Sequence, residues 1–142
     1  MTELIMRAKA HWGYDQAFLD ACRPSLMLTA ADIARNQVYC AAVAGMVTGV
    51  CHLYLLSADE AYLDHLFVEP AFIGTGIGAL LWRHAVEVAV ALGAKTLVLG
   101  ADPNARPFYE RMGAVVVGEI ISPLIPGRVT PRMRYELPAP GR

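Results

Sequence analysis

Two hydrophobic periodicities divide the chain into strands and helices. In six stretches the apolar residues either run together or alternate with polar ones, which is typical of buried and half-buried strands. The last stretch is the clearest, because Val129, Met133 and Tyr135 alternate with polar residues and predict a strand with one polar face. We expect strands over residues 38–43, 46–55, 62–69, 95–99, 114–121 and 129–137.

Other stretches have the spacing of amphipathic helices. The longest places Leu81, Ala85 and Val88 on one face and ends at Gly93, because glycine readily adopts the left-handed conformation that follows a helix. We expect helices over residues 4–9 (with a possible extension to 11), 15–22, 76–92 and 104–112.

Local signals mark where several of these elements begin and end. The Arg-Pro-Ser sequence at 23–25 is expected to break the second helix, since proline has no N–H to donate. Thr29 can cap a further short helix, with Asp32 at the capping-box position. Pro70 ends the strand over 62–69 for the same reason that proline breaks a helix.

The stretch from 38 to 58 contains no formally charged residue and is long enough to span a bilayer. Because Ala44-Gly45 is a turn signal in its middle, a buried hairpin explains it better. The strand over 62–69 can then pair antiparallel with 46–55, and residues 62–99 form a right-handed βαβ unit. The expected fold class is α/β of the α+β type, with one mixed, mostly antiparallel central sheet flanked by helices.

Composition narrows the class of protein. The 142 residues, 56% hydrophobic and 18% charged, fit a single globular domain over 1–142. The formal net charge of −1 gives no electrostatic argument for nucleic acid or an anionic membrane as partner. Residues 1–9 lack the apolar run of a secretory signal, and three cysteines without CxxC spacing fit buried thiols in a reducing compartment. We expect a cytoplasmic protein that binds neither nucleic acid nor membrane.

Three glycines at alternate positions follow the strand over 62–69 and lead into the longest helix. Gly74, Gly76 and Gly78 leave the backbone without side chains, so that its N–H groups can surround a ligand. The start of the following helix adds further unpaired N–H groups and the positive end of its dipole. Together they predict an anion site for a phosphate-bearing ligand.

One interpretation of the glycines is a dinucleotide-binding fingerprint. Residues 74–79 match G-x-G-x-x-G/A, and Asp102 follows after the next strand, where such a fold places its ribose-binding acid. The context argues against a nicotinamide enzyme, because Pro70 ends the strand before the first glycine. In addition, the chain has only one βαβ unit and too few residues after it for a second nucleotide-binding half.

Another interpretation uses motifs from both halves of the chain. Val68-x-Pro70 precedes the Gly-x-Gly-x-Gly sequence, and Asn104-x-x-Pro-Phe108-Tyr109 follows the next strand. In this order and spacing they resemble the GNAT family of N-acetyltransferases over residues 62–118. The resemblance implies a GNAT-like acyl-CoA N-acyltransferase fold that uses acetyl-CoA as co-substrate.

The chain departs from that family in two places. Ile73 stands where the family usually has Arg or Gln, which removes a side-chain contact to the phosphates but leaves the backbone amides. The family usually begins with a strand, and residues 1–9 contain no good candidate for one. We expect this first strand to be absent or supplied by a partner chain.

The resemblance also implies contacts to the co-substrate. Backbone groups of Phe67 and Val68 would hold the pantetheine arm like an added strand, with Asn104 on its other side. A helix cap explains Asn104 equally well, and a core position is an alternative for Phe108, which we also assign to the co-substrate site. The pyrophosphate would lie on the backbone of Gly74, Thr75, Gly76, Ile77 and Gly78.

Two residues are candidates for proton transfer. Tyr109 matches the family's tyrosine that faces the thioester sulfur, and a phenol with a pKa near 10 can protonate a thiolate with a pKa near 8.5. A buried tyrosine whose hydroxyl only caps a backbone group is the alternative. Asp64 and His65 are neighbours on a strand and would point to opposite faces, so at most one reaches the cleft. For the base that deprotonates the amine we favour Asp64, and an ordinary structural role is the alternative for either residue. Glu60 and Glu69 are more remote alternatives.

The sequence predicts no metal site. None of the four histidines lies in an HExxH motif or comparable spacing, and the adjacent Cys51 and His52 would point to opposite faces of a strand. Three arginines, Arg128, Arg132 and Arg134, alternate near the last strand, where their face is either solvated or meets an anionic substrate or a second copy of the chain.

The predicted activity is transfer of the acetyl group of acetyl-CoA to the amine of a small molecule or peptide by direct attack. Tyr109 would be the general acid and Asp64 the base. A catalytically idle acyl-CoA-binding or sensor domain of the same fold is the first alternative, and a nicotinamide-dependent oxidoreductase is the second. No motif identifies the acceptor amine. The nearly all-apolar helix over 76–92 and the missing first strand favour a homodimer.

Overall fold

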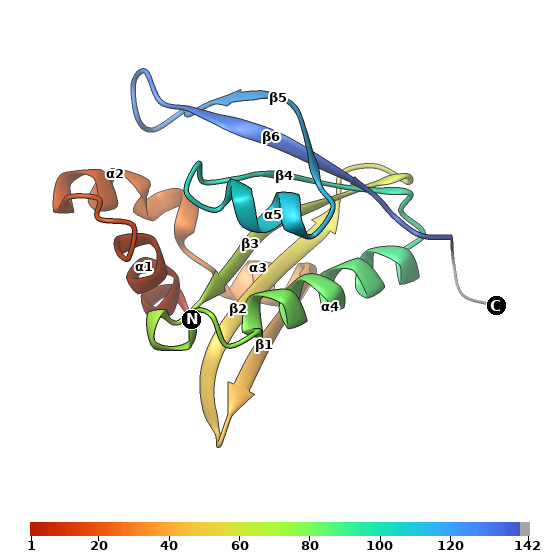
Figure 1. Cartoon of the computed structure of the whole chain (residues 1–142), viewed down its shortest axis with the longest axis horizontal. Coiled ribbons are helices and arrows are strands. Elements are labelled where there is room, and N and C mark those ends of the chain that lie inside the picture. Colours follow the sequence, from red (N-terminus) through yellow and green to blue (C-terminus); the bar gives the residue numbers. More distant parts are fainter. Residues whose placement is uncertain (140–142) are drawn as a thin grey trace.

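The computed structural model describes residues 1–139, which form a six-stranded sheet with helices on both of its faces (Figure 1). The strands are β1 (Gln37–Val43), β2 (Met46–Leu55), β3 (Glu60–Val68), β4 (Thr96–Gly100), β5 (Val115–Ile121) and β6 (Val129–Glu136). The helices are α1 (Thr2–Ala10), α2 (Gln16–Leu26), α3 (Ala30–Arg35), α4 (Ile77–Ala91) and α5 (Arg106–Arg111), with a 3-10 turn over Pro70–Phe72.

The strand order is β1-β2-β3-β4-β6-β5, and only β3 and β4 run parallel. The helix α4 connects these two strands, so the predicted βαβ unit and the mostly antiparallel sheet are confirmed. Each predicted strand lies within two residues of the observed one. Over the described residues no strand precedes α1.

The uncharged stretch over residues 38–58 forms the predicted β1–β2 hairpin, not a membrane-spanning helix. Its two turn residues, Ala44 and Gly45, have φ values of 51° and 80°, as a two-residue hairpin turn requires. Within residues 1–139 no helix combines the length and the apolar character that crossing a bilayer requires.

Helix α2 contradicts the prediction that Pro24 ends it, because the helix continues to its last residue at position 26. Pro24 has no N–H to donate to the Asp20 carbonyl, but the other groups of the last turn are still hydrogen-bonded. The Ser25 hydroxyl donates to the Cys22 carbonyl at 2.9 Å. The Met27 N–H donates to the Arg23 carbonyl at 3.0 Å and closes the helix. A proline near the end of a helix is therefore tolerated here.

Two helix starts show how well caps can be predicted. The capping box of Thr29 and Asp32 is confirmed, since each side chain accepts a hydrogen bond from the other residue's backbone N–H. Helix α5 begins later than predicted, with Ala105 rather than Asn104 at its N-cap. Asn104 is therefore not a helix cap, which removes that alternative for this residue.

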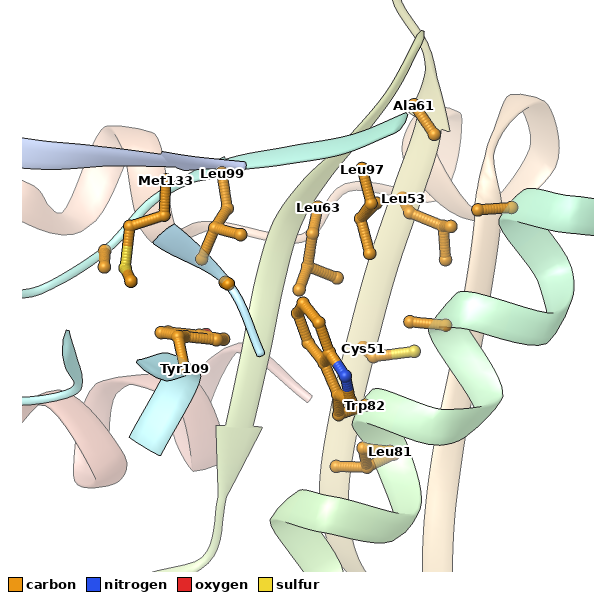
Figure 2. Close-up of a cluster of buried hydrophobic side chains, with 14 of the residues drawn as sticks. Cys51, Leu53, Ala61, Leu63, Leu81, Trp82, Leu97, Leu99, Tyr109 and Met133 are labelled. Carbon is orange, nitrogen blue, oxygen red and sulfur yellow. The ribbon is translucent and has the colours of Figure 1, made fainter. Parts of the chain in front are cut away.

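Two clusters of buried apolar side chains pack on opposite faces of the sheet. The larger joins α4 and α5 to the strands, and the Trp82 ring of α4 points into it toward Leu63 (Figure 2). The smaller packs α1 and α2 against Val50 and Phe67. Burial of each such side chain contributes about 1.5–3 kcal/mol, so helices on both faces are held firmly against β3.

The sheet opens at the parallel pair. Strand β3 pairs with β2 as far as Val68, but it pairs with β4 only from Glu60 to Tyr62. Beyond Tyr62 the two strands diverge, and β2 and β3 slope away from β4 and β6 (Figure 1). One backbone edge of β3, over residues 63–68, therefore has no strand beside it.

Candidate functional site

A cavity of about 760 Å³ occupies the opening between β3 and β4. Its walls come from α1, α2, β3, the glycine loop, α5 and the segment before β6. Nine of the eleven residues assigned to the site from the sequence line it, namely Asp64, Phe67, Val68, Gly74, Gly76, Gly78, Asn104, Phe108 and Tyr109, and so does Ile73. Elements far apart in the chain thus converge on one cleft.

The glycine loop presents free backbone donors at one end of the cleft. Gly74 and Gly76 have φ values of 83° and 91°, a conformation that side chains with a Cβ rarely adopt. Among the described residues, the N–H groups of Gly74, Gly76, Ile77 and Gly78 donate to no backbone carbonyl. With the start of α4 they form an electropositive end suited to an anion.

Thr75 differs from its neighbours in the loop. Its N–H and its hydroxyl both donate to the Phe72 carbonyl, and neither Thr75 nor Ile77 contributes to the cavity lining. Gly78 has a packing role as well, because a Cβ there would lie 3.1 Å from the Phe108 ring. The loop is thus stabilised by hydrogen bonds from Thr75 to Phe72 and packs closely against Phe108 of α5.

Tyr109 and Phe108 lie side by side on α5. The Tyr109 ring is 7% exposed and meets Trp82 and Phe108 edge-on, with centroids 5.7 Å and 5.1 Å away. Burial raises the pKa of Tyr109 well above its usual value, so the phenol stays protonated. Both side chains belong to the core cluster and also line the cleft, which joins the two roles considered for Phe108.

Asn104 takes part in a polar cluster at the far wall of the cleft. Its amide Nδ2 donates to Asp102 Oδ1 at 2.9 Å and to the Tyr14 hydroxyl at 3.0 Å. Asp102 also accepts from Lys9 and lies 3.4 Å from an Arg128 nitrogen. Burial alone would raise the pKa of Asp102, but the Lys9 ammonium and the hydrogen bonds from the Asn104 N–H and Tyr14 together outweigh it, and the pKa falls. Asp102 is thus occupied by protein contacts and is not a free ribose-binding acid.

Asp64 lies in a bulge of β3 and corrects a prediction. His52 is opposite His65, and the next pair is Leu53 with Leu63, so that Asp64 is an extra residue in its strand. The prediction that Asp64 and His65 point to opposite faces is wrong, since Asp64 Oδ2 lies 3.9 Å from His65 Nδ1. Only Asp64 lines the cleft, and its side chain is 36% exposed.

His52 joins this pair from the neighbouring strand, with its Nδ1 2.9 Å from that of His65 and 3.8 Å from Asp64 Oδ2. Sequence spacing missed the cluster, because its members come from two strands and only the bulge brings all three to one face. An extra residue in a strand leaves no clear sequence signal.

The glutamate alternatives for the base are engaged elsewhere. Arg7 forms a two-bonded pair with Glu69, with both nitrogen–oxygen distances at 2.8 Å. This hydrogen bond lowers the pKa of Glu69 and makes it a weaker base. Glu60 lies 3.9 Å from Arg132, at the closed end of the β3–β4 pair.

Comparison with known proteins assigns the fold to a family. A sheet that splays at its one parallel pair, with a glycine loop at the following helix, is the architecture of an acyl-CoA N-acyltransferase. A family model for the acetyltransferase (GNAT) domain matches residues 8–122. The chain belongs to this GNAT acetyltransferase family, as its motifs predicted.

Individual relatives match over shorter lengths. The chain is 28% identical over 81 residues to the uncharacterized N-acetyltransferase YafP of Escherichia coli (strain K12), covering 57% of this chain and 47% of that protein. It is 37% identical over 65 residues to the peptidyl-lysine N-acetyltransferase YjaB of Salmonella typhimurium, covering 46% and 43%. The chain spans about half the length of the curated relatives it matches.

A solved structure matches over nearly the whole chain. The PaiA N-acetyltransferase of Thermoplasma acidophilum, in complex with coenzyme A, superposes with a TM-score of 0.79 and 16% identity. The match covers 95% of this chain and 89% of that one. At this identity the likeness establishes a common fold.

Proposed function

We propose that this chain transfers the acetyl group of acetyl-CoA to an amine of a small molecule or peptide. The observation that carries the proposal is the convergence of free loop amides, an unpaired strand edge and the Tyr109 side chain on one cavity of about 760 Å³. The loop amides suit a diphosphate, the strand edge suits a pantetheine arm, and the Tyr109 hydroxyl suits a thioester sulfur. Membership of the GNAT family supports the same activity.

The residues present fit acetyl-CoA, which supplies the acyl group as an activated thioester. The amides of Gly74, Gly76, Ile77 and Gly78 would bind the pyrophosphate. The open edge of β3 at Phe67 and Val68 would bind the pantetheine arm as another strand would. The Asn104 side-chain oxygen Oδ1 makes no hydrogen bond to another described residue. It can therefore accept one from the pantetheine arm, on the side opposite β3.

The amine would be deprotonated on the side of the cleft formed by Asp64. At neutral pH a typical amine with a pKa near 10.4 is protonated in all but about one molecule in a thousand. Asp64 is the carboxylate of β3 that lines the cavity. A proton taken there leaves the amine's lone pair free to attack the thioester carbon directly.

Tyr109 would serve the departing sulfur. Its raised pKa keeps the hydroxyl protonated at neutral pH, so a hydrogen-bond donor is available at every turnover. The ring is held by Trp82 and Phe108, which fixes the direction of the hydroxyl. We expect it to donate a hydrogen bond to the thiolate first. The raised pKa opposes full transfer of the proton, which therefore comes late in the step.

The test is a Tyr109→Phe variant beside a matched Tyr135→Phe variant. Tyr135 meets the same Trp82 ring edge-on, with centroids 5.3 Å apart, but it does not line the cavity. We expect Tyr109→Phe to lower kcat about 100-fold or more with CoA affinity changed less than about 2-fold, and Tyr135→Phe to leave both nearly unchanged.

Two results would contradict the proposal. Binding of acetyl-CoA by the wild type, without turnover on any member of a panel of polyamines, amino acids, aminoglycosides and peptides, would favour an idle acyl-CoA-binding domain. Thermal stabilisation by NADH but not by acetyl-CoA would favour a nicotinamide enzyme. The cytoplasm remains our proposed location, supported by the three free cysteines.

A further inference from the structure

Two buried histidines face each other beside the cleft. His52 and His65 have side chains 1% and 2% exposed, and their Nδ1 atoms are 2.9 Å apart. The ring planes differ by 16° and the centroids are 5.1 Å apart. That centroid distance is close to the sum of the Nδ1–Nδ1 distance and the two short centroid-to-nitrogen distances. The nitrogens therefore meet head-on, as in a straight N–H···N hydrogen bond.

This geometry distinguishes a proton-sharing pair from a metal site, although Asp64 and the two histidines offer three ligand atoms within 4.8 Å of one another. A zinc ion lies about 2.0–2.1 Å from each imidazole nitrogen, where both lone pairs converge. Here the Nδ1 atoms point at each other with no room for an ion between them. One proton shared by two neutral rings satisfies both nitrogens.

The outer nitrogens of the pair differ in their surroundings. Asn36 Nδ2 lies 3.0 Å from His52 Nε2, and an amide donor there leaves His52 protonated on Nδ1. His65 then accepts at Nδ1 and carries its own proton on Nε2. That Nε2 is buried and has no hydrogen-bond partner among the described residues.

Asp64 connects this pair to the cleft. Its Oδ2 lies 3.8 Å from His52 Nδ1 and 3.9 Å from His65 Nδ1, so the carboxylate is equally close to both. The same carboxyl group lines the cavity in which the amine would react. The bulge in β3 creates this position, because a regular strand would turn Asp64 to the other face.

We propose that Asp64, His52 and His65 act as one proton-accepting unit, in which Asp64 takes the amine's proton from the cleft and the histidine pair holds it. This inference rests on the acetyltransferase function proposed above. The ammonium N–H bond breaks, its electron pair stays on nitrogen, and an O–H bond forms on Asp64. The proton then passes to an Nδ1, the His–His hydrogen bond opens, and both Nδ1–H groups donate to the Asp64 carboxylate. The charge of the unit changes from −1 to zero.

The unit solves a problem of basicity. An ordinary carboxylate, with a pKa near 3.9, is about 400-fold less basic than an imidazole with a pKa near 6.5. Asp64 alone would therefore return its proton to the amine far more readily than an imidazole would. A histidine pair with a carboxylate beside it keeps the proton longer and still releases it near neutral pH.

Some groups around the histidine pair raise the pKa of His65 and others lower it. The pKa of His65 is lowered, because burial and the neighbouring His52 outweigh Asp64, the Leu26 carbonyl of α2 and Asp32 of α3, which raise it. The neutral form of His65 is therefore favoured at rest, with negative charge nearby to balance an added proton. Two tyrosines complete the surroundings: Tyr54 of β2 lies beside His52, and Tyr62 of β3 lies beside Tyr54.

The kinetic test compares pH profiles of kcat/KM for the wild type, His65→Gln and His84→Gln. His84 lies on α4, contacts Tyr39 and does not line the cleft, so it is the matched control. We expect the acidic limb of the wild type below about pH 6.5, and that of His65→Gln about two pH units lower, with a plateau 10- to 100-fold lower. An acidic limb that does not move in His65→Gln would overturn the inference.

A second measurement needs no turnover and no histidine variant. Two-bond ¹H–¹⁵N NMR spectra of the histidine rings report which nitrogen carries a proton. We expect His52 and His65 to titrate together, and Asp64→Asn, at a partly exposed position, to lower both midpoints. Independent titration unaffected by Asp64→Asn, or stoichiometric binding of added Zn²⁺ to both rings, would overturn the inference. Absence of acetyl transfer in the wild type would overturn the proposed function as well, whereas transfer with an unmoved limb would overturn this inference alone.

Discussion

The Lys9 ammonium on α1 lies 2.5 Å from Asp102 Oδ2, and both side chains are about one-tenth exposed. The same carboxylate accepts from the Tyr14 hydroxyl at 2.9 Å and lies 3.4 Å from Arg128. It therefore joins three segments that are distant in sequence: the N-terminal helices, the loop before α5 and the segment before β6. These segments form one wall of the cleft, so a single buried carboxylate determines its shape.

Replacing Asp102 with Asn should destabilise the protein. The change leaves the buried Lys9 ammonium without its counter-charge, and we expect the free energy of unfolding at pH 7 to fall by about 3 kcal/mol. Urea unfolding measures this difference. Glu110→Gln is the control, because its pair with Arg106 is about half exposed and should contribute under about 0.5 kcal/mol.

The same pair makes a prediction about pH. The pKa of Asp102 is lowered in the folded state, so its stabilisation is fully present above the unfolded value near 3.9 and is lost as the pH falls through the folded value. The difference between wild type and Asp102→Asn should therefore hold from about pH 5 to 8 and shrink below about pH 4. A difference that grows with acid would contradict the assignment.

Alanine variants at two glycines distinguish an effect on stability from an effect on CoA binding. Gly76 and Gly93 have φ values of 91° and 88°, and a Cβ at either would meet no atom within 4 Å. We expect Gly76→Ala and Gly93→Ala each to cost about 1–2 kcal/mol of stability, because both would hold alanine in a left-handed conformation. Only Gly76→Ala should also weaken CoA binding, as measured by calorimetry. Equal CoA affinity in the two variants would show that the loop at Gly76 does not bind the co-substrate.

Ile73 offers a gain-of-affinity experiment. It lines the cleft and is 46% exposed, at the position where the GNAT family usually carries Arg or Gln. We expect Ile73→Arg to strengthen CoA binding about 3- to 10-fold at low salt, and the gain to shrink at about 0.5 M salt, because a partly exposed guanidinium–phosphate contact is screened. Leu80→Arg, on the exposed side of α4 at 51% exposure, is the control and should change nothing. No gain at low salt would mean that no phosphate lies near residue 73.

Locally determined features could be predicted from the sequence. The Ala44-Gly45 turn, the Thr29–Asp32 capping box and the end of α4 at Gly93 each depend on residues within a few positions. The glycine loop follows from its own spacing, whereas the α5 residues follow from the resemblance to the GNAT family. The βαβ connection brings both to one opening.

Features that depend on distant contacts could not be predicted. Asp102 matched a dinucleotide motif, but Lys9, 93 residues away, takes its carboxylate. Asp64 and His65 share a face only through a bulge whose register is set by pairing with β2. In each case the deciding partner lies outside the local sequence window.

The central claim is that the loop before α4 binds the diphosphate of CoA through its backbone. Backbone ¹H–¹⁵N NMR spectra of the wild type test it directly, in one titration with CoA and in a separate one with pantetheine, which lacks the diphosphate. We predict large shifts of the Gly74, Gly76, Ile77 and Gly78 amides with CoA and only small ones with pantetheine, while Phe67 and Val68 respond to both. Unmoved loop amides at saturating CoA would contradict the account.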